Sequence, residues 1–288
     1  MSWTNYHSHC HYCDGKEPPR AHVDSAVRKG MLVFGFSSHS PVPFHTTWSM
    51  PLEKATNYIR EITQIKQAYA KKIQIYTGLE VDYVPGTMGP NNRLIKNLGL
   101  DYTIGSVHFV DRFSDDTPWE IDGQHKVFLY GLSQIFKGNI KLAVSRYFEL
   151  TRRMLEEDRP DVLGHMDKIK IQNEEGQLFN EDETWYKQEV LRTLKVIAKS
   201  KVTVEVNTRG MYKKKTHETY PSRWILEKLH EMSVPIQLNA DSHHPDELTS
   251  HFETTAAMLK EIGFKYLRVL IDGKWQSVPF SKKGVEYE

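Results

Sequence analysis

The sequence predicts an α/β barrel that forms one domain over residues 1–288. Short apolar runs rich in β-branched residues alternate with longer segments of helical period, which is typical of repeated βα units around a parallel sheet. The chain contains no Pro/Ser/Gly-rich linker and no low-complexity tract at which it would divide. Because α/β barrels of roughly 250 residues commonly fold as one unit, a single domain is the simplest interpretation.

The expected strands are short apolar runs, and the segments between them are expected to return the chain to the start of the next strand. The strands are Trp3–Tyr6, Leu32–Phe36, Ile73–Thr77, Tyr102–Gly105, Val162–Leu163, Val202–Val206, Ile236–Leu238 and Tyr266–Ile271. The segment Asp111–His125 has no clear period and is expected to be a loop. The tail after Trp275 supports no assignment.

Three segments carry the spacing of amphipathic helices. In Leu52–Ala70, Ile59, Ile62, Ile65 and Tyr69 recur at intervals of three and four, after a proline suited to a helix start. The segments Ile140–Leu155 and Trp185–Ala198 repeat this pattern. We therefore expect these helices to cover the outside of the barrel.

The composition excludes several classes of protein. Lys plus Arg number 38 and Asp plus Glu 37, a net charge of +1, whereas a dedicated nucleic-acid binder usually carries a basic surplus. The sequence begins without the pattern of a signal peptide, and no apolar stretch approaches the ~18 residues needed to span a bilayer. Cys10 and Cys13 are too few for a disulfide framework. We expect a cytoplasmic protein with neither nucleic acid nor membrane as a partner.

The CxxC pair and the three consecutive lysines at 213–215 have simple alternative interpretations. Cys10-His11-Tyr12-Cys13 would suit zinc or redox chemistry, but the sequence has no second CxxC and no thioredoxin-like pattern around it. The lysines favour a solvated loop over an anion-steering patch. The role of the two cysteines and the oligomeric state are not predicted.

The 14 histidines are the unusual feature of the composition, and several follow expected strands directly. These are His7, His9, His39, His108 and His165; the carboxylates Glu80 and Asp241, and His243, follow strands in the same way. The carboxyl ends of parallel barrel strands open on one face, so these side chains are expected to converge there. Buried imidazoles and carboxylates together are costly unless a cation binds both. The pattern thus predicts a metal site.

The spacing of two motifs sharpens this prediction. His7 and His9 are alternate residues and can point at the same ion. Glu80 has two carboxylate oxygens and can bridge two ions about 3.5 to 4 Å apart, as in two-metal hydrolytic sites. Imidazole and carboxylate ligands without thiolate suit Zn, Mn or Fe, and the sequence does not choose among them.

Six ordered motifs give the chain a resemblance to a known family. They are His7-Ser8-His9, Ser38-His39-Ser40-Pro41, Gly78-Leu79-Glu80-Val81-Asp82, Ile104-Gly105-Ser106-Val107-His108, Leu163-Gly164-His165-Met166-Asp167 and Asp241-Ser242-His243. The chain resembles the PHP (polymerase and histidinol phosphatase) superfamily and, within it, the histidinol-phosphate phosphatases, from Tyr6 to about Phe252. The resemblance implies a distorted (β/α)7 barrel with two or three divalent metal ions. Two departures are Ser38 and Ser242, where relatives often have Asp and Ala; Ser38 affects the surroundings of His39.

The resemblance also implies which residues hold each ion. One ion is assigned to His7, His9, Glu80 and Asp241, the second to Glu80, His108 and His165, and the third to His39, His243 and Asp14. The residues expected to carry catalysis are Glu80, Asp241 and His243. The assignment of Asp14 depends on a spacing that varies among family members.

A phosphate ester also needs positive charge around its oxygens. Arg209 follows an expected strand and is the first candidate for a bidentate contact with phosphate. Lys168 and Lys170 come shortly after His165, and Ser222 lies in a segment that resembles the histidinol phosphatases. These four residues are the expected substrate-binding set.

The expected function is hydrolysis of L-histidinol phosphate, a small phosphate monoester, in histidine biosynthesis. One alternative keeps the site and changes the substrate to a phosphotyrosyl protein or a nucleotide. Another is a metal-binding module without catalysis, although 288 residues contain no companion polymerase domain. An amidohydrolase also begins with His-x-His, but the sequence shows no convincing lysine to be carboxylated as a bridge.

Overall fold

The computed structural model describes residues 2–173 and 176–287, and within them seven parallel strands form the central sheet. The strands follow one another in chain order across this sheet: β1 (Thr4–Asn5), β2 (Val33–Phe36), β3 (Gln74–Asp82), β4 (Tyr102–Ser106), β7 (Val162–Leu163), β8 (Thr203–Asn207) and β9 (Ile236–Asn239). The expected domain limits, residues 1 and 288, lie outside the described residues.

The sheet closes nearly into a barrel where its first and last strands meet. Ser8 and Ser242, just beyond β1 and β9, form a parallel bridge. The amide of His9 donates to the carbonyl of Ser242 at 2.7 Å, and the amide of Ser242 donates to the carbonyl of His7 at 3.1 Å. The predicted (β/α)7 barrel is therefore confirmed, and its closing seam runs through residues that the sequence assigned to the metal site.

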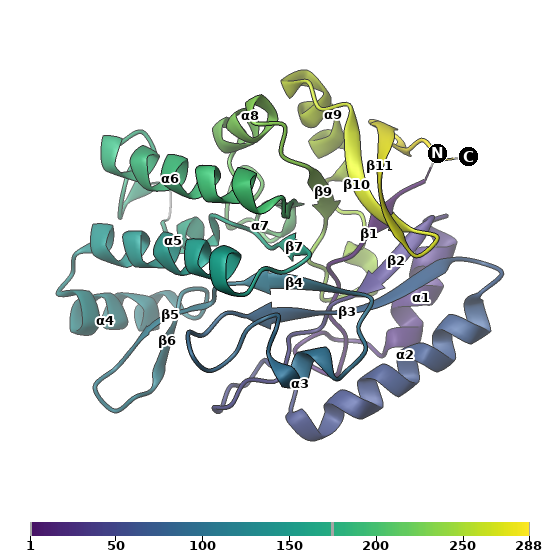
Figure 1. The fold of residues 1–288 in the computed structure, drawn as a ribbon, viewed down its shortest axis with the longest axis horizontal. Helices are drawn as coiled ribbons and strands as arrows, with labels where there is room; N and C mark the ends of the chain where they lie inside the picture. Colours follow the sequence, from purple (N-terminus) through teal and green to yellow (C-terminus); the bar gives the residue numbers. More distant parts are fainter. Residues whose placement is uncertain (1, 174–175, 288) are drawn as a thin grey trace.

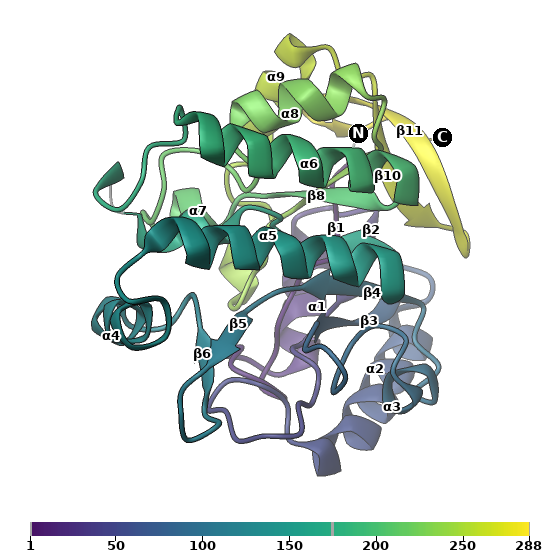
Figure 2. The ribbon, with the colours of Figure 1, turned by 60° about the vertical axis from the view of Figure 1, so that its left-hand side comes forward.

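Helices cover the outside of the barrel (Figures 1 and 2). The longer ones are α1 (Pro19–Arg28), α2 (Ala55–Tyr69), α4 (His125–Phe136), α5 (Ile140–Glu157), α6 (Thr184–Ser200), α8 (Arg223–Glu231) and α9 (Phe252–Ile262); α3 (Arg93–Lys96) and α7 (Arg209–Tyr212) are single turns. The three helices predicted from periodicity correspond to α2, α5 and α6. In Figure 2, α5 and α6 lie side by side across one flank. None of the helices in the described part of the chain is long and apolar enough to cross a membrane.

The structure differs from the predicted elements at three places. Strand β3 continues past the predicted end at Thr77 as far as Asp82, so Glu80 lies within a strand. Gly78 permits this, because a Cβ there would approach the Tyr102 ring to 2.6 Å. The predicted loop 111–125 instead forms most of a hairpin of β5 (Phe109–Arg112) and β6 (Pro118–Glu120), with Trp119 fully buried.

The third difference concerns the pairing of the last predicted strand, whose bounds are confirmed. Strand β10 (Tyr266–Ile271) exists, but it pairs antiparallel with β11 (Lys274–Ser281), and β12 (Gly284–Val285) completes a separate three-stranded sheet. This sheet packs against the barrel through buried Tyr6, whose hydroxyl donates to the carbonyl of Leu270 at 2.9 Å. Figure 1 shows the hairpin beside β9 and β1, near both termini.

Candidate metal centre

The candidate ligands come from six barrel strands and the turns that follow them. His7 and His9 follow β1, His39 follows β2, Glu80 is in β3, His108 follows β4, His165 follows β7, and Asp241 and His243 follow β9. All eight side chains are buried, and Asp14, in the turn after β1, joins them at the edge. The structure thus brings together all nine residues that the sequence proposed as ligands. We call this set the His/Asp/Glu cluster.

Glu80 lies at the centre of the cluster, and its two oxygens face different histidines. Oε2 is 3.2 Å from Nε2 of His7 and 3.0 Å from Nδ1 of His39. Oε1 is 2.8 Å from Nε2 of His165 and 3.6 Å from Nε2 of His108. A carboxylate placed between two sets of imidazoles in this way can bridge two cations.

The ligand atoms fall into three overlapping groups. In each group, one atom per residue lies within 4.8 Å of the others: His9, Asp14, His39 and His243; His7, His9 and Asp241; and His39, Glu80 and His108. The groups share His9 and His39, so the candidate ion positions lie close together. The third ligand set implied by the family resemblance, His39, His243 and Asp14, is contained in the first group.

The residues present fit divalent cations, because several buried polar atoms of the cluster otherwise lack partners. Nε2 of His7, Nε2 of His9, Nδ1 of His39 and Oδ1 of Asp14 have no hydrogen-bond partner. Leaving such atoms unpaired costs about 1–3 kcal/mol each, which a bound cation would offset. The donors are nitrogen and oxygen, which suits zinc, manganese or iron.

The electrostatics keep the carboxylates of the cluster ionised. Burial by itself raises the pKa of Glu80, but the charges of His7, His39 and His108 hold it well below its usual value. Asp241 behaves likewise: burial raises its pKa, but the charges of His7 and Arg209, with the hydrogen bond from His9 and the charge of Lys168, hold it well below its usual value. Burial lowers the pKa of His9 well below its usual value, and the neighbouring His243 adds to this, so its ring is neutral and can donate a lone pair.

The backbone at Asp241 is held in an uncommon conformation. Its φ is 52°, in the left-handed region that costs a non-glycine residue roughly 1 kcal/mol or more. Two side chains from the β8 end hold it there: Asn207 Nδ2 donates to Asp241 Oδ2 at 3.1 Å, and Arg209 Nη1 donates to the carbonyl of Asp241 at 2.8 Å. Arg209 therefore helps to build the cluster as well as line its entrance.

A cavity of about 380 Å³ opens beside the cluster. Its wall includes the ligands Asp14, His39, Asp241 and His243, the basic residues Lys168, Arg209, Lys213 and Lys215, and Trp48, Glu120, Asp122 and Tyr220. Nζ of Lys168 lies 3.1 Å from Asp122 and 3.4 Å from Nε2 of His108. The Trp48 indole donates to Glu120 at 2.8 Å. Of the four residues predicted to bind substrate, Arg209 and Lys168 line this cavity.

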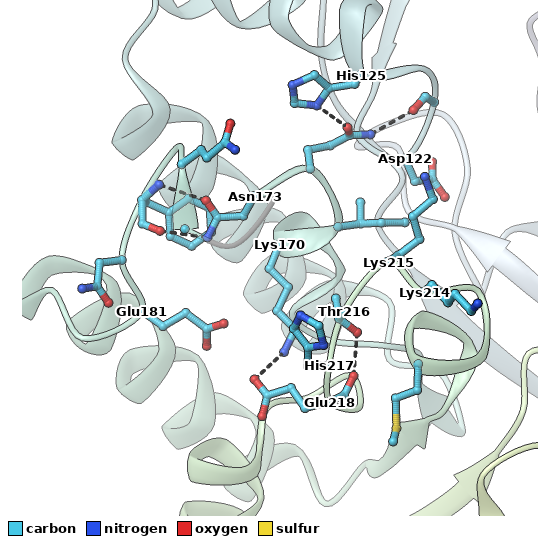
Figure 3. A pocket seen from close by; sticks show the side chains of 18 of the residues that line it. Asp122, His125, Lys170, Asn173, Glu181, Lys214, Lys215, Thr216, His217 and Glu218 are labelled. Atoms are coloured by element: carbon cyan, nitrogen blue, oxygen red, sulfur yellow. Dashed lines mark hydrogen bonds and ion pairs between the residues drawn. The ribbon is translucent and has the colours of Figure 1, made fainter.

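Lys170 lines a different cavity, and Ser222 contacts Lys170 there. The larger second cavity, about 1200 Å³, adjoins the first along Asp122, Gly123, Ile171 and Lys215. Figure 3 shows Lys170 pointing toward Glu218 in this cavity. Its ammonium also donates to Asp167 at 2.9 Å and to the Ser222 hydroxyl at 2.5 Å. The structure therefore does not bring Lys170 and Ser222 to the cluster.

Sequence reasoning missed the residues that support the ligands and shape the cavity. Glu205 and Asp82 are buried carboxylates whose oxygens contact the Nδ1 atoms of His7 and His108. A signal existed for both, because Asp82 shares a strand face with Glu80 and Glu205 is a charge inside an otherwise apolar strand. Glu120 and Asp122 gave no signal, since their segment carries no clear pattern.

Comparisons with known proteins agree with this geometry. A family model described as "PHP domain" matches residues 5–209. A Deinococcus radiodurans protein named "Probable histidinol-phosphatase" is 26% identical over 248 residues, covering 85% of this chain and 87% of the relative.

Two solved structures share the fold. A proposed histidinol phosphatase from Listeria monocytogenes has a TM-score of 0.75 at 22% identity and covers 87% of this chain and 99% of its own. Histidinol phosphate phosphatase from Lactococcus lactis, solved with zinc, L-histidinol and phosphate, has a TM-score of 0.65 at 20% identity and covers 99% of both chains. At these identities the structures establish the shared barrel.

Proposed function

This chain belongs to the PHP domain family, and we propose that it is a metal-dependent phosphomonoesterase that hydrolyses L-histidinol phosphate to L-histidinol and phosphate. The observation that carries the proposal is the His/Asp/Glu cluster, which is centred on a carboxylate whose two oxygens face different histidines. The cavity beside it is lined by both basic side chains and carboxylates. The relative from Deinococcus, named for this activity, supports the choice of substrate.

Two or three divalent ions would be held by His7, His9, Asp14, His39, Glu80, His108, His165, Asp241 and His243. Such ions act as Lewis acids and provide a hydroxide nucleophile at neutral pH. Glu80 would lie between them as the shared ligand, because its two oxygens face opposite sides of the cluster. The Lactococcus structure contains zinc, which makes zinc the first metal to test here.

The protein's own part in the reaction is to hold the ester. Arg209 and Lys168 line the cavity at the cluster and would contact the phosphoryl oxygens, with Lys213 at the rim. Charge-assisted contacts of this kind orient the phosphate and stabilise the charge on its oxygens as the bond to the leaving group breaks. Lys170 and Ser222 would reach a bound ester only if it extended into the second cavity.

The lining of the cavity favours a substrate whose leaving group carries an amine, such as histidinol phosphate, over a phosphotyrosyl protein. Glu120 and Asp122 line it, and Asp122 is held ionised: burial raises its pKa, but Lys168 and His108 lower it to about 2. These carboxylates suit the ammonium and imidazole of histidinol. A phosphotyrosine side chain carries no positive charge for them to pair with. The expected partner is thus a small phosphate monoester, and a cytoplasmic location stays a prediction.

Kinetics on a panel of esters would test the proposal. We expect kcat/KM for histidinol phosphate to exceed the values for phosphotyrosine, nucleoside monophosphates and p-nitrophenyl phosphate, and activity to be lost with a chelator and restored by zinc or manganese. Preference for phosphotyrosine or a nucleotide would assign the same site to another substrate. Metal binding without hydrolysis of any ester would favour a non-catalytic module.

A further inference from the structure

Glu205 is a fully buried carboxylate at the centre of the barrel, and it is not one of the candidate metal ligands. It lies in the middle of β8 and accepts four hydrogen bonds. His7 Nδ1 and Asn239 Nδ2 donate to Oε1 at 2.6 and 3.0 Å; the His165 amide and Asn207 Nδ2 donate to Oε2 at 2.9 and 3.0 Å. One carboxylate therefore connects β8 to β9 and to the chain just beyond β1 and β7.

The contact with His7 fixes which ring nitrogen carries the proton. A carboxylate only accepts hydrogen bonds, so Nδ1 keeps its proton and donates it; when the ring loses its other proton to bind a cation, the free lone pair is on Nε2. That Nε2 is the atom directed into the cluster, 3.2 Å from Glu80 and without a hydrogen-bond partner. The Glu205 contact thus selects the tautomer in which His7 can bind a cation.

The contact with His165 fixes the position of a second candidate ligand. The backbone amide of His165 donates to Glu205, while its Nε2 lies 2.8 Å from Glu80 on the opposite oxygen from His7. Glu205 therefore holds one imidazole on each side of the central carboxylate. Both would be displaced together if its hydrogen bonds were lost.

A second carboxylate beside the His/Asp/Glu cluster makes a similar contact with a single histidine. Asp82 accepts from Nδ1 of His108 at 2.9 Å and from its backbone amide at 3.3 Å. Metal-bound histidines commonly donate their other ring nitrogen to such a carboxylate, and removing it typically weakens metal binding 10- to 100-fold. Glu205 differs because it acts on two histidines from different strands.

We infer that Glu205 is the positioning residue that sets the tautomer of His7 and the placement of His165, so that both sides of the metal centre depend on one buried carboxylate outside it. The inference rests on the proposed metal-dependent function. It assigns Glu205 no contact with the substrate.

The test is Glu205→Gln, which keeps the shape and replaces one oxygen by an amide donor. All four of the groups around Glu205 are donors, so the new NH2 must face a donor on one side. Either His7 takes the other tautomer, with its Nε2 protonated, or the His165 amide loses its partner. We expect zinc or manganese affinity, measured by competition with a chelating dye, to fall about 10- to 100-fold, with retained circular dichroism.

The matched control is Asp161→Asn. Asp161 also accepts a barrel-strand amide, that of Thr103 at 2.8 Å, but it lies just before β7, at the other end of the barrel strands from the cluster. We expect the Asp161→Asn variant to bind metal with the same affinity as the parent. Equal affinity in Glu205→Gln and parent would overturn the inference while leaving the proposed function intact. A parent that binds metal but hydrolyses no histidinol phosphate would overturn the function and leave the inference standing.

A measurement on the parent covers the case in which the variant does not fold. In the zinc-loaded protein, long-range 1H–15N spectra are expected to show His7 with a proton on Nδ1 and none on Nε2. A His7 ring bound to zinc through Nδ1, or protonated on Nε2, would contradict the inference without any variant.

Discussion

The inner and outer sides of the His/Asp/Glu cluster are built differently. On the inner side His7, His108 and His165 are at most 1% exposed, and two of them donate to buried carboxylates behind them. On the outer side Asp14 is 33% exposed, and Nδ1 of His243 lies 3.2 Å from the backbone carbonyl of Asp241 and 3.6 Å from its carboxylate, with no separate carboxylate behind it among the described residues. The inner ligands are preorganised for metal, whereas the outer ones border the cavity that substrate must enter.

This difference assigns separate tasks to the two sides. A rigid, water-excluded set of ligands strengthens electrostatic interactions and costs no reorganisation during reaction. A partly exposed set can adjust when the ester binds, and solvent weakens its charges. We therefore expect substitutions on the inner side to remove activity and substitutions on the outer side to reduce it.

The largest effect is expected from Glu80→Gln, which breaks the inner side at its centre. An amide cannot bridge two cations as an anion does, so kcat should fall by about 100- to 1000-fold or more with the fold retained. Activity assays with circular dichroism and metal analysis check this. Near-parental turnover in a folded variant with fewer bound ions would show that Glu80 is no bridge.

Arg209→Ala tests the cavity wall on the outer side. Loss of a charge-assisted contact with phosphate should lower kcat/KM by about 1.5–3 kcal/mol, roughly 10- to more than 100-fold. Because Arg209 also donates to the carbonyl of Asp241, metal content must be measured in parallel. A variant that matches the parent on every ester would return Arg209 to a purely structural role.

Asp14→Asn should have a smaller effect, because this carboxylate is partly exposed. For Asp14→Asn we expect one fewer tightly bound ion per chain and a kcat/KM about tenfold lower than that of the parent. For His165→Asn, on the inner side, we expect a much larger fall in kcat/KM. Metal analysis after dialysis, together with initial rates, separates the two variants. Equal losses would remove the distinction between inner and outer ligands.

Asp167 lies outside the His/Asp/Glu cluster, so Asp167→Asn should change the free energy of unfolding rather than metal binding. Burial raises the pKa of Asp167 to about 6 even though Lys170 opposes the shift. An acid whose folded pKa is raised destabilises the fold as pH rises from about 4 to 6, here by about 3 kcal/mol. Other buried carboxylates titrate in the same range, so the measured quantity is the difference between parent and variant: in denaturant unfolding, the free energy of unfolding of the parent should fall relative to that of the variant between about pH 4 and 6. If the free energies of unfolding of parent and variant changed with pH in parallel, the raised pKa of Asp167 would be contradicted.

The sequence predicted the site better than the parts around it, for a physical reason. A carboxylate or imidazole directly after a strand needs only the parallel topology to reach the barrel face, so Glu80, His165 and Asp241 could be identified from their positions. Glu205 gains its role from donors on β9 and next to β1 and β7, which only the closed barrel brings together. The partners of a buried charge cannot be identified from its own segment.

The same reasoning explains the misplaced elements. The β5–β6 hairpin depends on Trp119, whose burial against α4 is a tertiary contact without a local period. Strand β10 has the apolar pattern of a barrel strand, but its partner is the tail that supported no prediction. That residues 1–288 form one domain stays a prediction, which limited proteolysis would check.

Anomalous diffraction from zinc- or manganese-loaded crystals would test the central claim most directly. We expect two or three metal peaks in the cluster, with both Glu80 oxygens about 2.0–2.2 Å from inner ions. We also expect the outer peak, at Asp14, to disappear first as metal is withdrawn. Absence of any peak at Glu80, or an outer ion that persists after the inner ones are lost, would contradict the account.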